Sequence, residues 1–222
     1  MLISIIIPTL NEETSIEVLL QQLQYYRKKG HEVIVVDGGS CDKTVSISNN
    51  LADKVIESKL GRAIQMNNGV ISARNDVLWF LHADTLIPDT ALENIQKILE
   101  KNDWGRFNVK LSGKNILFRV IEKMINVRSC LFGIATGDQG IFVKKQTFES
   151  VGCYSELPLM EDVELSKKLK KKSRPACIKG ALITSSRRWE QKGILATVLL
   201  MWRLRFLYWL GVNADKLASQ YK

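Results

Sequence analysis

The chain alternates short runs rich in Val and Ile with stretches of helical periodicity, and this alternation limits the folds open to it. Apolar runs predict four strands, at 2–7, 33–36, 54–57 and 77–81. Between the first two runs, apolar residues recur at helical spacing at Ile16, Leu19, Leu20, Leu23 and Tyr26. Strands of this composition that alternate with helices form parallel sheets covered on both faces. The predicted fold is α/β, with a mostly parallel central sheet flanked by helices.

The second half of the chain, after Pro88, is less regular. It predicts helices at 90–100, 116–132 and 162–172, and strands at 106–111, 139–143 and 176–183. No repeat, low-complexity tract or linker divides the chain, and 222 residues of 45% apolar content suffice for one large domain. We therefore expect a single domain.

The amino terminus and the cysteines bear on location. MLISIIIPTLNEE has neither a basic lead nor a small-residue cleavage site, so we expect a buried first strand and not a signal peptide. The four cysteines, which lie far apart without a CxxC pair, predict neither a disulfide framework nor a structural zinc site: Cys41, Cys130, Cys153 and Cys177. A reducing cytoplasm is the expected location.

The formal net charge of +9 comes largely from the carboxyl-terminal half. Basic residues crowd 167–174, and Arg187 and Arg188 follow. The run at 167–174 continues a predicted helix without interleaved aromatic residues, so a solvated helix face is expected and nucleic acid is not. Anionic lipid or a phosphorylated substrate is the alternative partner.

The stretch 194–210, ILATVLLMWRLRFLYWL, is the most hydrophobic part of the chain. Arg203 and Arg205 interrupt it, and a central charge costs roughly 2.5 to 3.5 kcal/mol in a bilayer, so no transmembrane span is expected. Its aromatic residues suit a helix in the membrane interface, whereas a buried or dimer-forming helix explains the same apolarity. Both interpretations stay open.

Several catalytic motifs are absent. No GxGxxG follows a strand, and neither GxxxxGK[ST] nor GxSxG occurs. His31 and His82 are the two histidines in the sequence, so a metal ion would need oxygen ligands.

Isolated carboxylates follow predicted strands instead. Asp37 precedes two glycines that allow close approach to a ligand, and Asp84 follows a later apolar strand. With a diphosphate present, one carboxylate can hold Mg²⁺ or Mn²⁺. Turn capping by Asp37 and helix-start chemistry by Glu161 and Asp162 are the structural alternatives.

Taken together, these motifs resemble the family 2 glycosyltransferases of the GT-A fold. The resemblance rests on five segments: IIPTLNEE at 6–13, VDGGS at 36–40, GRAIQMNNG at 61–69, LHADTLIP at 81–88 and MEDVEL at 160–165. TGDQGIFV at 136–143 and SSRRWEQKG at 185–193 are similar to one subgroup, the radical-SAM/selenodomain-associated glycosyltransferases, and the similarity covers nearly the whole chain.

The resemblance implies a division of 1–222 into a nucleotide-binding half at 1–105, an acceptor half at 106–193 and a C-terminal amphipathic helical segment at 194–222. It implies that the nucleotide donor is bound by Pro8, Thr9, Asn11, Glu12, Asp37, Gly38, Arg62, His82, Ala83 and Asp84. It implies that sugar and acceptor meet Gly137, Asp138, Gln139, Glu161, Arg188 and Trp189. Asp84 would be the metal ligand, for Mg²⁺ or Mn²⁺, and Asp162 the general base.

Two departures from the family pattern matter. His82 replaces the first Asp of the DxD motif, so metal coordination would rest on Asp84. Arg188 and Trp189 match the end of the QxxRW motif of processive synthases, but Ser185 fills the Gln position and no membrane span follows, so polymer synthesis is not expected.

The resulting prediction is an inverting glycosyltransferase. It would move a sugar from a UDP- or GDP-sugar to a small-molecule or lipid acceptor, with metal assistance. Peripheral contact with an anionic membrane at the inner face and a homodimer are further expectations. The alternatives are a nucleotidyltransferase and a non-catalytic nucleotide-sugar binding protein.

Overall fold

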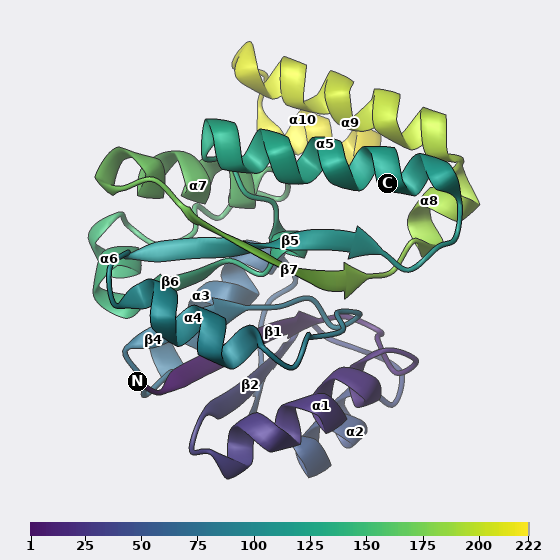
Figure 1. Ribbon diagram of the computed structural model, residues 1–222. Helices are drawn as coiled ribbons and strands as arrows, with labels where there is room; N and C mark the ends of the chain where they lie inside the picture. The colour runs from purple at the N-terminus through teal and green to yellow at the C-terminus, as the bar shows by residue number, and fades with distance from the viewer. Residues whose placement is uncertain (222) are drawn as a thin grey trace.

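The computed structural model, which describes residues 1–221, confirms the predicted α/β fold (Figure 1). One sheet has the strand order β3-β2-β1-β4-β6-β5-β7. Its strands are β1 (Ile3–Thr9), β2 (Glu32–Asp37), β3 (Lys54–Glu57), β4 (Val77–Phe80), β5 (Trp104–Leu111), β6 (Phe142–Lys144) and β7 (Ala176–Thr184). β6 runs antiparallel to its neighbours β4 and β5, and the other pairings are parallel.

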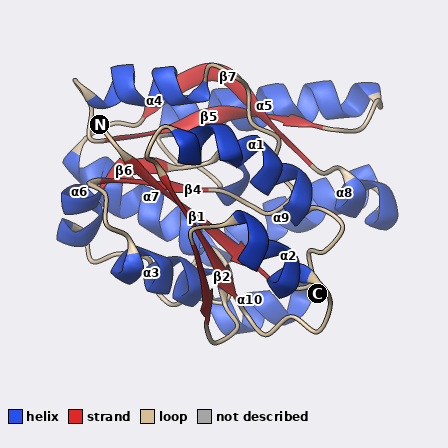
Figure 2. Cartoon of the chain, turned by 90° about the horizontal axis from the view of Figure 1, so that it is seen from below, coloured by secondary structure: helices blue, strands red, loops and turns tan. Residues whose placement is uncertain are grey.

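Helices cover both faces of the sheet (Figure 2). They are α1 (Ile16–Lys28), α2 (Thr44–Leu51), α3 (Arg62–Ser72), α4 (Ala91–Leu99), α5 (Ile116–Phe132), α6 (Lys145–Ser150), α7 (Glu161–Lys172), α8 (Arg187–Lys192), α9 (Ile194–Trp209) and α10 (Ala214–Tyr221). In β1, Ile5 and Ile7 pack against the apolar faces of α1 and α4, whereas Ile6 packs against α3. This alternation is the two-residue period of a strand buried on both sides.

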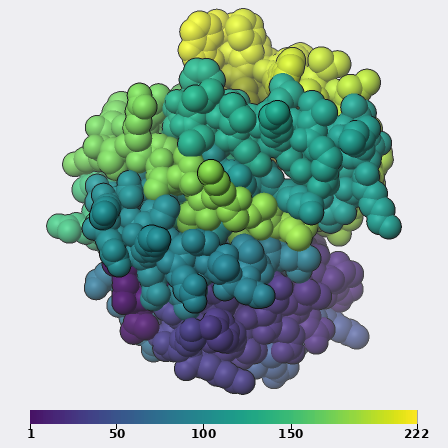
Figure 3. All heavy atoms as spheres, viewed as in Figure 1, coloured from purple at the N-terminus to yellow at the C-terminus, as the bar shows by residue number. Residues whose placement is uncertain are grey.

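A further layer lies beside β5 and β7. Figures 1 and 3 show α5, α9 and α10 gathered at the top of the molecule. Leu204 of α9 and Leu217 of α10 form a small core with Val163, and Phe118 of α5 forms another with Leu111. Of the sixteen residues of α9, only Thr197 and Leu204 are buried. No helix within residues 1–221 is long and apolar enough to cross a bilayer.

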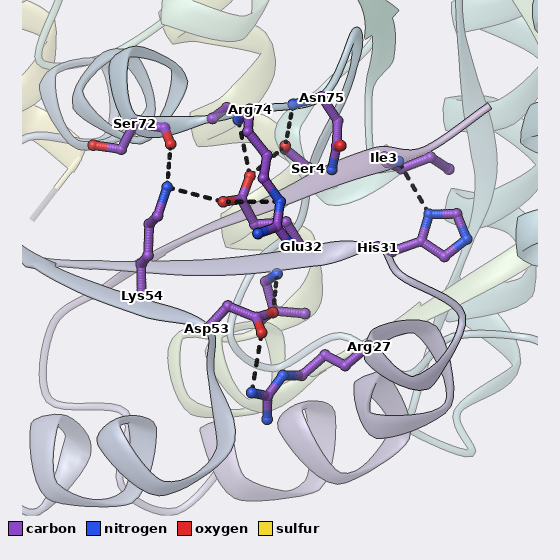
Figure 4. Close-up of polar contacts among 12 residues, drawn as sticks. Ile3, Ser4, Arg27, His31, Glu32, Asp53, Lys54, Ser72, Arg74 and Asn75 are labelled. Carbon is purple, nitrogen blue, oxygen red and sulfur yellow. Dashed lines mark hydrogen bonds and ion pairs between the residues drawn. The ribbon is translucent and has the colours of Figure 1, made fainter.

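Glu32, at the amino end of β2, has no exposed surface and closes one edge of the sheet (Figure 4). Its carboxylate accepts hydrogen bonds from Ser4 Oγ at 2.7 Å and from the Arg74 N–H at 3.0 Å. Lys54 Nζ lies 2.9 Å from it in an ion pair. Burial raises the pKa of Glu32, but these partners outweigh burial, and the net pKa falls below its ordinary value. The ionised carboxylate therefore joins β1, β2 and β3.

His31 precedes β2 and is buried. Its Nδ1 accepts a hydrogen bond from the Ile3 N–H at 3.0 Å. Burial, with help from the nearby amino terminus, lowers its pKa, so the ring is neutral when it accepts this bond.

The cysteine expectation is corrected by a disulfide between Cys130 of α5 and Cys177 of β7. The two residues are 47 positions apart and meet through packing of a helix on a strand, which spacing cannot reveal. Cys41 and Cys153 are free. The basic run at 167–174 was expected to form a solvated helix face. Lys170, Lys171 and Lys172 are exposed on α7, in agreement with this expectation.

The strand expected at 139–143 is wrong at its start. Residues Gly137–Gln139 form a 3-10 turn, because Thr136 and Gln139 cap each other in a capping box. Gly140 then adopts φ 54°, and a Cβ at this position would collide with Leu182. Only after this bend does the chain enter β6.

Candidate active site

The loops that follow β1 and β2 are tied to each other at the carboxyl edge of the sheet. Asn11, at φ 53°, donates its N–H to Ser40 Oγ at 2.8 Å. Its side-chain oxygen accepts from the Cys41 N–H at 2.8 Å. The Glu12 N–H donates to Thr44 Oγ1 at 2.8 Å. Asn tolerates a positive φ better than most residues, and here it turns the chain so that Glu12 lies in the wall of a cavity.

Asp37 ends β2, as predicted, and organises this double loop. Its carboxylate accepts from the Gly39 and Ser40 N–H groups at 2.9 and 2.7 Å, from Ser40 Oγ at 2.5 Å and from Thr9 Oγ1 at 3.1 Å. These four bonds match the acceptor capacity of a carboxylate. In the protein without ligand, Asp37 therefore has the turn-capping role given above as the structural alternative. A nucleotide that contacts Asp37 would have to compete with these four hydrogen bonds or share an acceptor oxygen with them.

Gln65 is a structural residue that the sequence prediction missed. It lies on the buried face of α3, and its Nε2 donates to the carbonyl oxygens of Thr9 at 2.9 Å and Val36 at 2.8 Å. It thus joins the ends of β1 and β2. A polar residue between Ala63 and Met66 on an apolar helix face is the signal that could have indicated it.

A cavity of about 1140 Å³ opens above these loops. Ten of the predicted site residues line it: Glu12, Arg62, His82, Asp84, Gly137, Asp138, Glu161, Asp162, Arg188 and Trp189. Seven predicted residues do not: Pro8, Thr9, Asn11, Asp37, Gly38, Ala83 and Gln139. Gln139 is fully buried, and its Nε2 donates to Ser129 Oγ at 2.9 Å. The structure therefore brings together residues from both halves of the chain.

His82 is part of the cavity wall. A Cβ at position 137 would lie 2.6 Å from His82 Nε2, so Gly137 leaves the space that the imidazole occupies. Burial, together with the positive charge of Arg62, lowers the pKa of His82 to about 3. The ring is neutral at physiological pH and offers one nitrogen as an acceptor.

Glu12 and Asp84 form the first pair of carboxylates. Burial and the nearby charge of Asp84 raise the pKa of Glu12, and its Oε2 is buried without a hydrogen-bond partner. Asp84 accepts one long hydrogen bond, 3.4 Å, from Thr184 Oγ1 at the end of β7. Two carboxylates that repel each other, one with an unpartnered buried oxygen, suit a cation. Within residues 1–221, no group of three or more His, Cys, Asp or Glu side chains could hold a metal alone.

Glu161 and Asp162 begin α7 and form the second pair. Asp162 accepts from the Gly137 N–H at 2.8 Å through Oδ2 and from the Val163 N–H at 2.6 Å through Oδ1. Glu161 is only 6% exposed. Burial and the charge of Asp162 raise the pKa of Glu161 to about 7, against the opposing effect of Arg62. Glu161 is therefore partly protonated near neutral pH.

Two arginines that the sequence prediction did not assign to the site complete this side. Arg128 of α5 and Arg205 of α9 line the cavity, with Arg128 Nη2 and Arg205 Nε buried and unpartnered. Asp138 lies nearby with Oδ1 buried and unpartnered, and burial raises its pKa. Burial, with repulsion from Arg205, lowers the pKa of Arg128 to about 10. Charged residues inside apolar helices were the available signal.

Arg188 and Trp189 belong to α8, which closes the cavity beside α9. The Arg188 guanidinium stacks on the Tyr221 ring at 3.6 Å and donates to the Tyr221 carbonyl oxygen. Trp189 packs with Leu111 and Phe118. Through these contacts, both residues hold the C-terminal helices against the rim of the cavity.

The chain is similar to several known proteins. Residues 4–125, more than half of the chain, match Glycosyl transferase family 2. A PGL/p-HBAD biosynthesis glycosyltransferase of Mycobacterium tuberculosis is 37% identical over 163 residues, a match that covers 68% of this chain and 62% of the relative. An uncharacterized glycosyltransferase of Haemophilus influenzae is 32% identical over 108 residues, covering 46% and 43%. The chain thus spans about half the length of the curated relatives it matches.

Two solved structures share the fold. S. aureus TarS 1-349 in complex with UDP-GlcNAc gives a TM-score of 0.65 at 20% identity, covering 83% of this chain and 58% of TarS. The mannosyltransferase PcManGT from Pyrobaculum calidifontis, in complex with GDP-Man and Mn²⁺, gives 0.66 at 23% identity, covering 82% and 56%.

A mostly parallel sheet of this order, with carboxylates gathered at its carboxyl edge, has the architecture of the GT-A glycosyltransferases. The chain belongs to glycosyl transferase family 2. The predictions of fold and family are therefore confirmed, and membership of this family favours a glycosyltransferase over a nucleotidyltransferase. The radical-SAM/selenodomain-associated subgroup stays a prediction.

Proposed function

We propose that the protein transfers a sugar from a UDP- or GDP-sugar to an acceptor hydroxyl with inversion at the anomeric carbon. One observation carries the proposal: a single cavity holds two carboxylate pairs, Glu12 with Asp84 and Glu161 with Asp162. The charge of Arg62 acts on a member of each pair. The complexes of TarS with UDP-GlcNAc and of PcManGT with GDP-Man support the donor class.

The first pair is the candidate site for Mg²⁺ or Mn²⁺. The unpartnered oxygen of Glu12 and the weakly bonded carboxylate of Asp84 fit a hard cation that takes its other ligands from a diphosphate and water. Neutral His82 lies beside them. When bound, such an ion would supply neutralisation of the charge that develops on the leaving nucleoside diphosphate. Glu12 thus joins Asp84 as a candidate ligand.

The second pair is the candidate acid-base group. The acceptor oxygen forms a bond to the anomeric carbon, and its proton passes to Asp162. The bond from the anomeric carbon to the diphosphate oxygen breaks, and its electron pair leaves with the nucleoside diphosphate, which Arg62 can stabilise. Backbone N–H bonds to both oxygens of Asp162 fix its orientation while leaving acceptor capacity on each. A single displacement of this kind inverts the anomeric centre.

Glu161 has a different part in the same site. With a pKa of about 7 it is a hydrogen-bond donor in a large fraction of molecules near neutral pH. A protonated Glu161 can bind a sugar or acceptor oxygen without repelling Asp162. We therefore assign it to substrate binding and leave proton removal to Asp162.

Donor binding tests the proposal without knowledge of the acceptor. UDP-, GDP- and TDP-sugars are screened for thermal stabilisation with and without Mn²⁺. We expect one nucleotide to stabilise the protein, by roughly 2.7 kcal/mol at a hundredfold excess over Kd, and Mn²⁺ to increase the effect. If no nucleotide sugar stabilises the protein in either condition, the proposed function is wrong.

A further inference from the structure

Two exposed apolar stripes run along α5 and α9. On α9 the residues recur at spacings of four and three: Leu195, Leu199, Trp202, Phe206 and Trp209. On α5 the same spacing gives Ile116, Val120, Met124, Val127 and Leu131. Every one of these side chains is at least 48% exposed. Such spacing places each set on one side of its helix, so the monomer leaves two continuous apolar surfaces in water.

The two stripes border the same cavity. Val120, Met124, Val127 and Leu131 of the α5 stripe line it, and so does Trp202 of the α9 stripe. Figures 1 and 3 show both helices on the same side of the molecule. The cavity is therefore lined both by carboxylates and arginines and by apolar side chains of α5 and α9.

The exposed charges on α5 and α9 themselves are positive. α9 carries Arg203 and Arg205 and no acidic residue, and the acidic residue of α5, Glu122, is buried and paired with Arg119 at 2.9 Å. Lys123 and Arg203 are exposed on these helices, and Lys192 is exposed at the cavity rim. Apolar and tryptophan side chains bordered by exposed cations, in a chain of net charge +9, complement an anionic membrane surface.

Arg128 and Arg205 place two positive charges inside the cavity. Neither forms an ion pair among the described residues, and each keeps one buried nitrogen without a partner. Their charges act on Asp138, whereas Arg62 acts on Glu12 and His82. Asp138 and Asp162 in turn act on Arg128, so the two arginines lie on the side of the cavity that holds these acids. Unpartnered guanidinium groups there suit an anionic group of the acceptor.

From these observations we infer that the acceptor is an amphipathic lipid with an anionic head group, taken from a membrane on which the α5 and α9 stripes rest. This inference rests on the proposed function and names its acceptor class. The lipid chain lies between α5 and α9, the negative charge of the head contacts Arg128 and Arg205, and a head-group hydroxyl faces Asp162.

Vesicle sedimentation tests the membrane surface. Wild-type protein is mixed with vesicles of phosphatidylcholine alone or with added phosphatidylglycerol. We expect binding to the anionic vesicles, weakened by salt, and a loss of about tenfold or more in Leu131→Glu/Leu199→Glu. Ile71→Glu, at an exposed position of α3 outside the stripes, is the matched control and should bind as wild type. Wild type that stays in solution with every vesicle overturns this part, as does an equal loss in the control.

The same variants test a second copy of the chain as the occupant. Light scattering of lipid-free wild-type protein should report a monomer. A stable wild-type dimer that Leu131→Glu/Leu199→Glu converts to monomers would assign the stripes to a protein interface and overturn the inference.

Calorimetric titration tests the head group with three probes. Lysophosphatidylglycerol, below its micelle concentration, supplies chain, charge and hydroxyls; lysophosphatidylcholine lacks the net charge, and glycerol 3-phosphate lacks the chain. We expect the first to bind about tenfold or more tightly than either of the others. Arg128→Gln/Arg205→Gln should abolish the preference for charge, whereas Arg203→Gln, an exposed neighbour on α9, should retain it. Equal binding of the three probes, or equal effects of the two sets of variants, overturns the inference.

Nucleotide binding separates this inference from the proposed function. UDP and GDP are titrated into the same preparations with Mn²⁺. If nucleotide binds but the lipid probes do not, the acceptor class is wrong and the donor assignment stands. If no nucleotide binds, the proposed function itself fails.

Discussion

The two edges of the central sheet carry the same kinds of side chain and use them in opposite ways. At the amino edge, Glu32 is enclosed by Ser4, Lys54 and the Arg74 N–H (Figure 4). At the carboxyl edge, Glu12 keeps a buried oxygen without a partner, and Glu161 is buried beside Asp162. The pKa of Glu32 is lowered, whereas those of Glu12 and Glu161 are raised.

The difference lies in the partners, because both edges are buried. Hydrogen bonds and a cation compensate the desolvation of Glu32, so its charge stabilises the junction of three strands. Glu12 and Glu161 at the carboxyl edge lack this compensation, and desolvation together with like charges dominates their pKa values. Perturbed groups that line a cavity are typical of a ligand site. The carboxylate at the amino edge thus stabilises the fold, whereas those at the carboxyl edge are arranged to interact with a ligand.

The largest expected effect is that of Asp162→Asn. If Asp162 is the general base, transfer falls by about 10² to 10⁴ while donor affinity stays within about twofold. Asn keeps the side-chain shape and one acceptor oxygen. Initial rates at saturating donor and calorimetric donor binding measure the two quantities.

Asp215→Asn is the matched control, because Asp215 is an exposed carboxylate in the first turn of α10. Its transfer rate should equal that of wild type. Transfer by Asp162→Asn within about threefold of wild type would assign Asp162 to structure and leave the base unidentified.

Next in size is the effect of Asp84→Asn on nucleotide binding. We expect affinity for nucleotide with Mn²⁺ to fall by about 10- to 100-fold, a range typical of damage to a metal site. Affinity without metal should be unchanged, and the ligand-free protein should not lose stability, because repulsion with Glu12 is relieved. Titration calorimetry and urea unfolding check both points, with Asp89→Asn, an exposed carboxylate, as control. Unchanged metal-dependent affinity would remove Asp84 from the metal site.

Glu32→Gln should show the reverse pattern at the other edge. We expect the free energy of unfolding to fall by about 1 to 2 kcal/mol, because the amide cannot replace charge-assisted hydrogen bonds. Nucleotide affinity and transfer should match wild type. Glu100→Gln, at an exposed position, controls for loss of charge in urea unfolding. A stable Glu32→Gln variant with impaired nucleotide binding would contradict the contrast between the edges.

The sequence predicted much of the fold, because β1, β2 and β4 are buried on both faces and read as continuous apolar runs. It also correctly placed Asp37 at the end of β2, Asp84 in the loop after β4 and Asp162 at the start of α7. It did not predict the bend at Gly140, where a capping box of Thr136 and Gln139 overrides the apolar pattern of a strand. The residues that form the capping box and the glycine are visible in the sequence. The bend that they produce, however, depends on how closely Gly140 packs against Leu182.

The sequence predicted the residues of the candidate site less completely than it predicted the fold. No motif marks Gln65, which joins the ends of two strands, or Arg128 and Arg205, which α5 and α9 bring into the cavity. No motif marks the pairing of Cys130 with Cys177 either. For Asp37 the position was predicted, but the four hydrogen bonds that it accepts were not.

The smallest effect is the dependence of stability on pH, and it has opposite signs at the two edges. The folded-state pKa of Glu161, about 7, exceeds its ordinary value of 4.5, so its contribution to stability is complete below pH 4.5 and is lost as the pH rises through 7. The folded-state pKa of Glu32 is lowered, so its contribution is present above pH 4.5 and is lost as the pH falls below that value. Urea unfolding of wild type, Glu161→Gln and Glu32→Gln over a pH series isolates each contribution by difference. The wild-type advantage over Glu161→Gln should decline from pH 4.5 to 7, whereas the advantage over Glu32→Gln should decline only under acid conditions. Differences with the same sign of slope would show that the two edges are not electrostatic opposites.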